Sequence, residues 1–415
     1  MYIERKLQEK VEKYIDSPEI IAVVGPRQSG KTTLLERIHS RFGDKAVFLS
    51  FEDPETISMF ETATADFINL YVKNKKALFI DEFQYSPSGG KILKQIYDSH
   101  KIKIFISGSS SIDLTVKALK YLVGRVFTFE LLPFDFEEFL RAKNIELTRF
   151  YIEHVKAGGI EDLSRAHLDF GEDVAAKLAG YFEEYTLYGG YPRVVTAADV
   201  KEKEEVLRGL YSTLFLREVK DYLGLTEDYR LHKLIKAFAL RVGNLIEYNE
   251  LGKLSECNFV LLKKYLNFLD KAYICSMIRP FFTNKNKELV KNPKAYMIDN
   301  GLRNFIVGDF RDLHSRPDAG ALLENAVYSG FRKQGLDIKY WRDKKKNEVD
   351  FIIEKNGRLT AIEIKLSLDG CAKNSGMAAF LQEHPGNAAL FAYLHGFNEN
   401  TGNNKGNTCL PAYVL

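Results

Sequence analysis

Residues 20–38 read IIAVVGPRQSGKTTLLERI, which is an apolar run, a glycine-bounded loop and a helical pattern in direct succession. The segment from Gly25 to Thr32 fits the pattern G-x-x-x-x-G-K-[ST]. A strand at Ile20–Val24 and a helix at Thr33–Ile38 are the flanks that a phosphate-binding loop requires. The stretch therefore predicts an α/β domain with a nucleotide-phosphate site after a strand, and a chance glycine-rich turn is the weaker alternative.

Each residue type in this loop has a chemical reason. Glycines let backbone N–H groups turn toward phosphates, and the positive N-terminal end of the following helix attracts them. We expect Lys31 to contact the β- and γ-phosphates and the Thr32 hydroxyl to hold Mg²⁺. The predicted nucleotide-binding residues are Gly25, Pro26, Arg27, Gln28, Ser29, Gly30, Lys31, Thr32 and Thr33.

Two later apolar runs end in polar side chains suited to the same site. Ala77–Ile80 is followed by Asp81 and Glu82. Asp81 is expected to hold Mg²⁺, directly or through water, and Glu82 to polarise the attacking water, unless both acids are merely solvated. Ile102–Ile106 is followed by Ser107, whose hydroxyl is a candidate sensor of the γ-phosphate or the lytic water, with ordinary loop chemistry as the alternative.

Composition limits the classes of protein that the chain can be. It has 415 residues, a formal net charge of +3 and 45% hydrophobic residues, which excludes a mainly disordered chain and a globally basic nucleic-acid binder. No signal peptide and no run of eighteen apolar residues is seen, so a cytoplasmic protein without a membrane segment is expected. The cysteines are too far apart to suggest a zinc site or a disulfide framework: Cys257, Cys275, Cys371 and Cys409.

Several motifs along the chain resemble those of bacterial and archaeal AAA-like (AAA_14-type) ATPases that carry a DUF4143 C-terminal region. The N-terminal motifs are Gly25–Leu35, Asp81–Gln84, Ser107–Ser110, Gly124-Arg125 and Leu132–Leu140, and the later ones are Tyr188–Pro192, Ile298–Leu302 and Glu348–Phe351. The resemblance implies an AAA+-like core that binds ATP rather than GTP. It also implies that Arg125 is a candidate arginine finger or sensor, although an arginine after glycine is commonly a surface residue.

The middle of the chain suggests a winged helix-turn-helix. A short helix at Tyr248–Leu254 and a longer one at Phe259–Leu269 precede two strand-like runs, Met277–Phe282 and Ala295–Ile298. The helices and hairpin carry basic residues that could meet DNA phosphates: Lys263, Lys264, Lys271, Arg279, Lys285, Lys287, Lys291 and Lys294. The alternative is that this unit contacts protein or packs between its neighbours.

Near the C-terminus, Asn356-Gly357 predicts a two-residue type I′ turn between two strands. Its register sets Asp350 opposite Glu363 and Glu348 opposite Lys365 on one face, where a divalent metal would relieve the repulsion of the acids. With Glu324 on the preceding helix, these residues resemble the PD-(D/E)xK nuclease core, in which Glu324, Asp350 and Glu363 bind Mg²⁺ and Lys365 positions water. The alternative is an inactive module in which Lys365 neutralises Glu348 and Asp350.

The predicted fold class is α/β: a P-loop AAA+-like parallel sheet with a helical subdomain, then a winged-helix unit and an α/β restriction-endonuclease-like domain. The expected domains are residues 1–200 (core about 1–133, helical subdomain about 134–200), 201–306 and 307–415. We expect a Mg²⁺-dependent ATP hydrolase whose nucleotide state controls the C-terminal half. DNA, a protein partner and a homo-oligomer remain open. The alternatives are a metal-dependent DNA nuclease regulated by ATP, and a nucleotide-gated DNA- or protein-binding regulator with negligible turnover.

Overall fold

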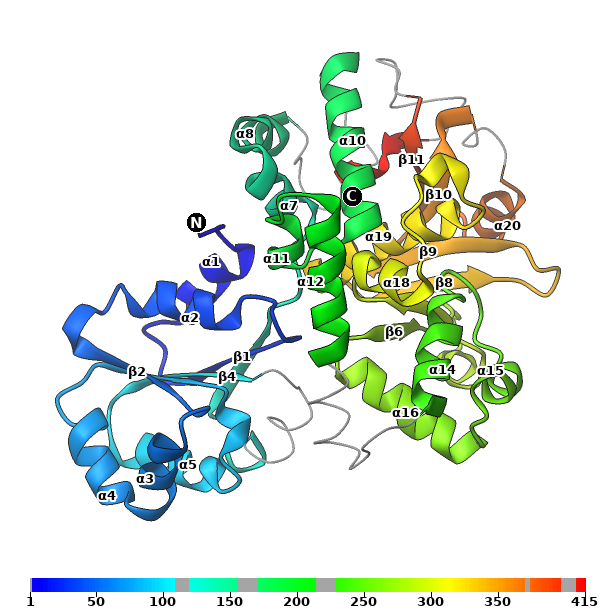
Figure 1. Ribbon diagram of the computed structural model, residues 1–415. Coiled ribbons are helices and arrows are strands. Elements are labelled where there is room, and N and C mark those ends of the chain that lie inside the picture. Colours follow the sequence, from blue (N-terminus) through cyan, green and yellow to red (C-terminus); the bar gives the residue numbers. More distant parts are fainter. Residues whose placement is uncertain (1, 109–118, 155–169, 214–228, 370–373, 397–407) are drawn as a thin grey trace. The chain divides into compact units, whose positions relative to one another are not determined.

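The computed structural model describes residues 2–108, 119–154, 170–213, 229–369, 374–396 and 408–415. These residues form two compact units, each of which is described separately below (Figure 1). The first unit is built on residues up to Phe134 and also includes Lys271–Tyr273. The second contains Asp135–Tyr211 and the described residues after Leu225 apart from that short segment. Among the described helices, none is long and apolar enough to cross a membrane.

The first unit is a parallel sheet covered by helices on both faces. Its strands are β1 (Ile20–Val24), β2 (Ala46–Ser50), β3 (Ala77–Asp81), β4 (Lys103–Gly108) and β5 (Val126–Glu130), in the order β2-β3-β4-β1-β5. The helices are α1 (Lys6–Glu12), α2 (Lys31–His39), α3 (Pro54–Thr62), α4 (Thr64–Phe67), which continues as a π-helical turn at Ile68–Val72, and α5 (Gly89–Ser99). The α/β sheet and the strands expected at Ile20–Val24, Ala77–Ile80 and Ile102–Ile106 are confirmed, and β2 and β5 complete the sheet.

Both faces of β1 are buried because its side chains alternate between two cores. Ile21 and Val23 pack with Val11 of α1 and Leu34 of α2. Ile20, Ala22 and Val24 pack in the opposite cluster, which contains aromatic and aliphatic residues of α3 and α5: Phe60, Leu93 and Ile96. A strand covered on both faces is continuously apolar, which explains the unbroken run IIAVV at residues 20–24.

The second unit begins with helices α7 (Phe136–Lys143), α8 (Ile145–His154), α10 (Glu172–Tyr188), α11 (Pro192–Val195) and α12 (Val200–Thr213). Asp135 caps α7 in a capping box with Glu138, which fixes the start of the helix. The expected helical subdomain of residues 134–200 is therefore present where it is described. It is grouped with the second unit rather than with the phosphate-loop core, which differs from the predicted boundary near residue 200.

The next part has the order helix, helix, helix, strand, strand. It contains α14 (Tyr229–Ala239), α15 (Tyr248–Ser255), α16 (Phe259–Lys271), and the antiparallel pair β6 (Cys275–Ile278) and β7 (Lys294–Met297). A short helix, α17 (Lys285–Val290), occupies the connection between β6 and β7. The predicted helix pair and hairpin are present, with strand bounds shifted by one to four residues.

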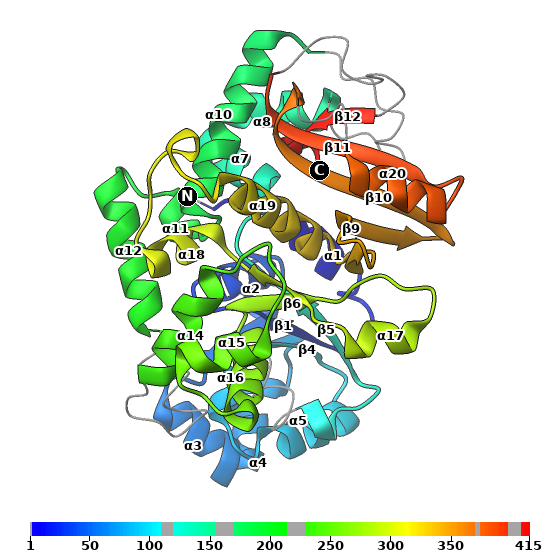
Figure 2. The same ribbon diagram turned by 90° about the vertical axis from the view of Figure 1, so that its right-hand side faces the viewer.

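The C-terminal part is a mixed five-stranded sheet flanked by two helices (Figure 2). After α18 (Asn300–Val307), its elements are α19 (Ala319–Gln334), β8 (Ile338–Arg342), β9 (Glu348–Lys355), β10 (Arg358–Ser367), α20 (Ser375–Glu383), β11 (Ala388–His395) and β12 (Thr408–Pro411). The strand order is β12-β11-β10-β9-β8, with β8, β9 and β10 antiparallel and β10, β11 and β12 parallel. Short 3₁₀ turns elsewhere in the described chain cover Gly43–Lys45, Phe83–Tyr85, Leu119–Tyr121, Leu313–Ser315 and Ala412–Val414.

The β9–β10 turn has the predicted geometry. Asn356 and Gly357 adopt φ angles of 51° and 76°, as a type I′ turn requires. The pairing runs from Lys355↔Arg358 to Phe351↔Ile362, which confirms the predicted register as far as that pair.

Two motifs of the sequence pack directly on each other and have a structural role. Asp299 accepts hydrogen bonds from the backbone N–H of Gly190 (2.7 Å) and of Leu302 (3.0 Å). A Cβ atom on Gly189 would lie 2.2 Å from Asp299 Oδ1, and one on Gly301 would lie 1.9 Å from the carbonyl oxygen of Tyr188. The glycines of Tyr188–Pro192 and Ile298–Leu302 are therefore needed for the close approach of α10 and α18.

Candidate functional site

The phosphate loop joins the buried end of β1 to the start of α2. Gly30 is the N-cap of α2 with a left-handed φ of 94°, and the first intrahelical bond runs from Leu34 N–H to the Gly30 carbonyl (3.0 Å). The N–H groups of Lys31, Thr32 and Thr33 are therefore not used inside the helix, which leaves them available to an anion. The Lys31 ammonium donates to the carbonyls of Gly25 (3.1 Å) and Pro26 (2.8 Å), so it lies across the loop.

Arg5, which the sequence did not single out, fastens this loop from the N-terminal segment. Its guanidinium donates to the carbonyl of Ser29 and to that of Leu132, both at 2.6 Å, and it lies over the Phe134 ring. The side chain is almost fully buried. No local pattern marks Arg5 in the sequence, because its partners lie 24 and 127 residues away.

The predicted metal ligands of the first unit meet at the carboxyl ends of β1, β3 and β4. The Thr32 hydroxyl donates to Asp81 Oδ2 at 2.7 Å. The Ser107 hydroxyl donates to the other carboxylate oxygen, Oδ1, and accepts from the Glu82 N–H at 3.1 Å. A hydroxyl and a carboxylate are oxygen ligands of the kind that Mg²⁺ binds, so this pair fits the predicted ion.

Glu82 is held in a conformation unusual for a side-chain-bearing residue. Its φ and ψ are 53° and 43°, in the left-handed region, directly after the buried strand β3. The Gln84 amide donates to the Glu82 carboxylate. Backbone and side chain are thus both fixed beside Asp81, as expected for a residue that must present a carboxylate at one position.

Arg125 lies at the opposite end of the same sheet. Its carbonyl accepts from the N–H of Ile20, the first residue of β1, whereas the phosphate loop follows the last residue of that strand. Its guanidinium pairs with Asp98 at 3.0 Å. Arg125 therefore lies away from the chain's own phosphate loop. Its role as an arginine finger or sensor stays a prediction, and as a finger it would have to act on a phosphate bound by another copy of the chain.

The second predicted metal site, in the C-terminal sheet, differs from expectation. Glu324, Asp350, Glu363 and Lys365 do gather, with the Ile364 N–H donating to Asp350 Oδ2 (2.9 Å) and Lys365 pairing with Glu363 (2.7 Å). The cation between the acids is Lys294 of β7.

The Lys294 ammonium lies 2.7 Å from Glu348, 3.1 Å from Glu324 and 3.4 Å from Asp350. Lys294 is thus buried rather than part of an exposed basic wing. The alternative of an inactive module assigned Lys365 to Glu348 and Asp350, whereas the lysine that contacts these two acids is Lys294. The place between Glu324 and Asp350 is taken by an ammonium, so these residues do not fit a resident Mg²⁺ as they lie.

Burial and charge perturb the acids of this cluster. Burial, and then the charge of Asp350, raise the pKa of Glu324 to about 8 and that of Glu363 to about 7. Burial alone would lower the pKa of Lys294, but the carboxylates around it raise that pKa above its ordinary value. The lysine therefore stays charged while the carboxylates compete for protons.

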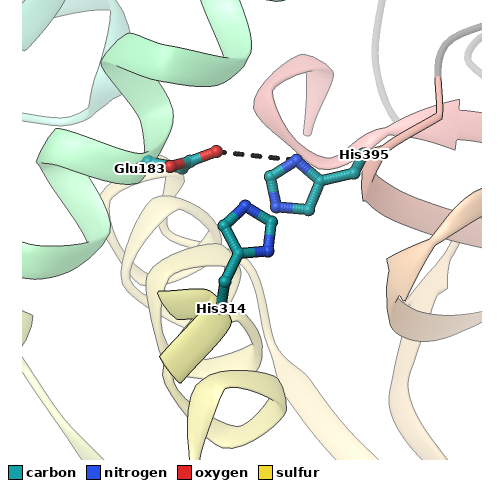
Figure 3. Close-up of side chains that lie close together, drawn as sticks. All are labelled: Glu183, His314 and His395. Carbon is teal, nitrogen blue, oxygen red and sulfur yellow. Dashed lines mark ion pairs between the residues drawn. The ribbon is translucent and has the colours of Figure 1, made fainter. Parts of the chain in front are cut away.

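A third cluster joins residues far apart in the sequence: Glu183 of α10, His314, and His395 at the end of β11 (Figure 3). Their candidate ligand atoms lie within 4.8 Å of one another, and His395 Nδ1 is 3.5 Å from Glu183. The two imidazoles, however, stack at 4.5 Å with an angle of 28°. Imidazole lone pairs lie in the ring plane, so rings stacked in this way do not aim at one ion, and we assign no metal here.

A basic groove of about 830 Å³ runs between α14 and α15 and the β8–β9 connection. The charged residues that line it are Lys233, Lys236, Arg241, Glu247, Arg342 and Lys346. Three of the cations already have carboxylate partners, which are Glu256, Glu250 and Glu348. Lys236 and Lys346 are exposed and make no ion pair within the described chain.

The strand order, the loop after β1 and the acids after β3 define a P-loop fold of the AAA type. A family model described as an AAA domain matches residues 17–140. Models described as Domain of unknown function (DUF8612) and Domain of unknown function (DUF4143) match residues 179–312 and 319–414. The chain therefore carries an N-terminal AAA domain and a C-terminal DUF4143 domain, which confirms the resemblance. The motifs at Tyr188–Pro192 and Ile298–Leu302, however, fall in the DUF8612 match.

Two relatives that are similar in sequence are themselves uncharacterised proteins. An uncharacterised protein of Methanocaldococcus jannaschii is 28% identical and covers 81% of this chain and 72% of its own. An uncharacterised protein of Haemophilus influenzae is 24% identical, with coverages of 88% and 86%.

Similar solved structures include AMPPCP-bound DnaA from Aquifex aeolicus, with a TM-score of 0.27 and 15% identity over 64% of this chain and 86% of that one. RuvB from Thermotoga maritima has a TM-score of 0.31 and 16% identity over 69% and 93%. At such scores these likenesses carry no argument. The fold assignment therefore rests on the sheet topology and the AAA-domain match.

An Arg5→Gln variant should bind ATP about 10- to 150-fold more weakly, because losing charge-assisted hydrogen bonds that order the loop costs on the order of 1.5–3 kcal/mol. Fluorescence titration with a labelled ATP analogue measures the dissociation constant. Arg41→Gln, which removes an exposed ion pair with Glu12, is the matched control and should leave affinity unchanged. A folded Arg5→Gln protein of wild-type affinity would contradict the role of Arg5.

The raised pKa of Glu324 predicts a pH dependence of stability. A carboxyl with a pKa of 4.5 when unfolded and about 8 when folded binds its proton more tightly in the folded state, so stability is lost as pH rises through that window. Glu324→Gln keeps a hydrogen-bond acceptor for Lys294 but cannot lose a proton. The melting temperature of this variant, measured by thermal denaturation, should therefore rise relative to that of wild type as pH increases from 5 to 8.

The size of this effect approaches about 1.4 kcal/mol per pH unit for one fully linked proton. Glu288→Gln is the control, because Lys339 and the Phe282 N–H lower the pKa of Glu288 against the effect of burial. Above pH 5, the melting temperature of Glu288→Gln should depend on pH in the same way as that of wild type. Parallel profiles for wild type and Glu324→Gln would show that Glu324 does not retain its proton.

Proposed function

We propose that the protein binds ATP and hydrolyses it with Mg²⁺ at the carboxyl edge of the N-terminal sheet, and that its nucleotide state controls the second unit. One observation carries the proposal: the Thr32 hydroxyl, at the start of α2, meets the Asp81 carboxylate, at the end of β3, at 2.7 Å. Two residues 49 positions apart thus form one oxygen pair beside a helix N-terminus.

The residues at this edge divide the chemistry among them. The backbone N–H groups in the first turn of α2 and the Lys31 ammonium would bind the phosphates and counter their charge. Thr32 and Asp81 would hold Mg²⁺, which supplies further charge neutralisation at the β- and γ-phosphates. The Ser107 hydroxyl holds Asp81 in position. It also accepts a hydrogen bond from the Glu82 N–H, which fixes the backbone of the proposed general base next to β4.

Glu82 would act on water. Its carboxylate, oriented by Gln84, would accept a hydrogen bond from a water lying in line with the γ-phosphate and increase its nucleophilicity. ATP rather than GTP is proposed because an AAA-domain model matches this part of the chain. A nucleotide-gated regulator would keep the same binding residues but turn ATP over negligibly.

Chain connectivity supports control of the second unit by the first. Lys271–Tyr273 is grouped with the first unit, although the elements on either side of it, α16 and β6, are built mostly from residues of the second. A displacement of the first unit on nucleotide exchange would therefore be transmitted through covalent bonds to both the last helix and the first strand of the helix–hairpin region.

Nucleic acid is a second candidate partner, favoured by the basic groove of α14, α15 and the β8–β9 connection. Lys236 and Lys346 project positive charge without a carboxylate partner among the described residues. Phosphates bind to such side chains with release of counterions, independently of sequence. The groove differs from the interface expected from sequence. That interface was formed by basic residues of the helices and the hairpin: Lys263, Lys264, Lys271, Arg279, Lys285, Lys287, Lys291 and Lys294.

Glu82→Gln should retain ATP binding and lose turnover by a factor of about 10²–10⁴, since a positioned general base contributes about that much. Phosphate release under single-turnover conditions, with and without DNA, measures the effect. Glu36→Gln, on the exposed side of α2, is the control. Unchanged phosphate release would remove Glu82 from its role, and no hydrolysis by wild type under either condition would favour the regulator.

A Lys236→Glu/Lys346→Glu double variant should weaken DNA binding and reduce the slope of log affinity against log salt by about 2, since each duplex phosphate contact contributes about 0.9. Fluorescence anisotropy at several salt concentrations measures both quantities. Lys263→Glu/Lys264→Glu has the same change in charge on α16 and should leave the slope unchanged. If only this control weakens binding, the α16 face is the DNA interface and the groove is not.

A further inference from the structure

The carboxylate cluster of the C-terminal sheet contains a cation supplied by a different part of the chain. Lys294 begins β7, the second strand of the two-stranded sheet, whereas its partners lie on α19 and β9. Its side chain is 1% exposed, the lowest value in the cluster. An ammonium removed from water to this extent is stable only with close polar or anionic partners, and Lys294 has the carboxyl groups of Glu348, Glu324 and Asp350 at 2.7–3.4 Å.

The acids around Lys294 are themselves arranged for a cation. Tyr296, also on β7, donates to Glu324, and the Ile364 N–H donates to Asp350, so both carboxylates are held in place. Glu363 is 6% exposed, and its Oε2 atom has no hydrogen-bond partner among the described residues. Carboxylate oxygens that converge from α19, β9 and β10 form a donor set typical of a divalent-metal site.

The contacts of each cation show which one the acids share. The carboxyl groups of Glu324, Glu348, Asp350 and Glu363 face three cationic side chains, Lys294, Lys365 and Arg342. Lys365 and Arg342 bind at the periphery, to Glu363 and to Glu348, and both are about 30% exposed. Only Lys294 contacts acids of both α19 and β9, which is the position that a bridging metal would take.

We propose that the Lys294 ammonium is the resident cation of this cluster, that it excludes a divalent metal while β7 remains in place, and that the carboxylates become a divalent-metal site when the ammonium is removed. Lys294 and a metal ion would need the same oxygens of Glu324 and Asp350, so the two are mutually exclusive. The C-terminal module is thereby closed to metal-dependent cleavage in the conformation described here. This inference does not depend on the ATPase proposal, because every residue in it belongs to the second unit.

The test compares binding of Mn²⁺ to the full chain without nucleotide in wild type, Lys294→Met and Lys294→Met/Asp350→Asn, by isothermal titration and by the loss of the free Mn²⁺ electron-resonance signal. We expect no Asp350-dependent Mn²⁺ in wild type. Lys294→Met should gain one Mn²⁺ per chain, and the added Asp350→Asn change should abolish that gain. Lys339→Met removes a half-buried lysine that pairs with Glu288 and should gain none.

Two results would overturn the proposal. One is a Mn²⁺ site in wild type that Asp350→Asn removes, and the other is a folded Lys294→Met protein that binds no additional Mn²⁺. If Lys294→Met does not fold, the wild-type titration against Asp350→Asn still decides the exclusion, and Lys294→Gln repeats the gain experiment with a polar side chain. Any Mn²⁺ held at the phosphate loop is identified because it persists in all variants.

Discussion

The first unit depends on one constraint: its strands run parallel, and the three central ones, β1, β3 and β4, are almost entirely buried on both faces. Because β1, β3 and β4 are neighbours in one direction, their carboxyl ends meet at one edge of the sheet. Thr32, Asp81 and Ser107, which belong to three separate segments, come within hydrogen-bond distance only for this reason. The helix that follows β1 begins at the same edge, so its N-terminal backbone N–H groups lie beside the predicted metal ligands.

The second unit is organised by buried polar contacts as much as by apolar packing. Asp299 holds the end of α10 against the start of α18, and glycines permit the close approach. Lys294 holds β7 to α19 and β9 through its carboxylate partners. Groups of this kind are costly to bury without their partners, so each of them fixes one arrangement of the elements around it.

The acid cluster at Asp81 and the one at Glu324 and Asp350 contain similar residue types, but only the first is expected to bind a metal ion. At Asp81 the carboxylate is met by the neutral hydroxyls of Thr32 and Ser107, so its negative charge suits a metal ion. At Asp350 and Glu324 the carboxylates are met by a buried ammonium, which already supplies the positive charge. The partner of the carboxylate, rather than the carboxylate itself, decides whether a metal is needed.

The sequence by itself determined the features that depend on neighbouring residues. The strand–loop–helix at residues 20–38, the cap at Asp135 and the Asn356-Gly357 turn were predictable because each is fixed by local backbone preferences and short spacings. Only the tertiary structure decided the contacts of Arg5 with the phosphate loop, the position of Arg125 at the far end of the sheet, and the insertion of Lys294 among the C-terminal acids. In these cases the partners are separated by tens of residues, and a charged side chain gives no sign in the sequence of whether it will be buried against them or left in water.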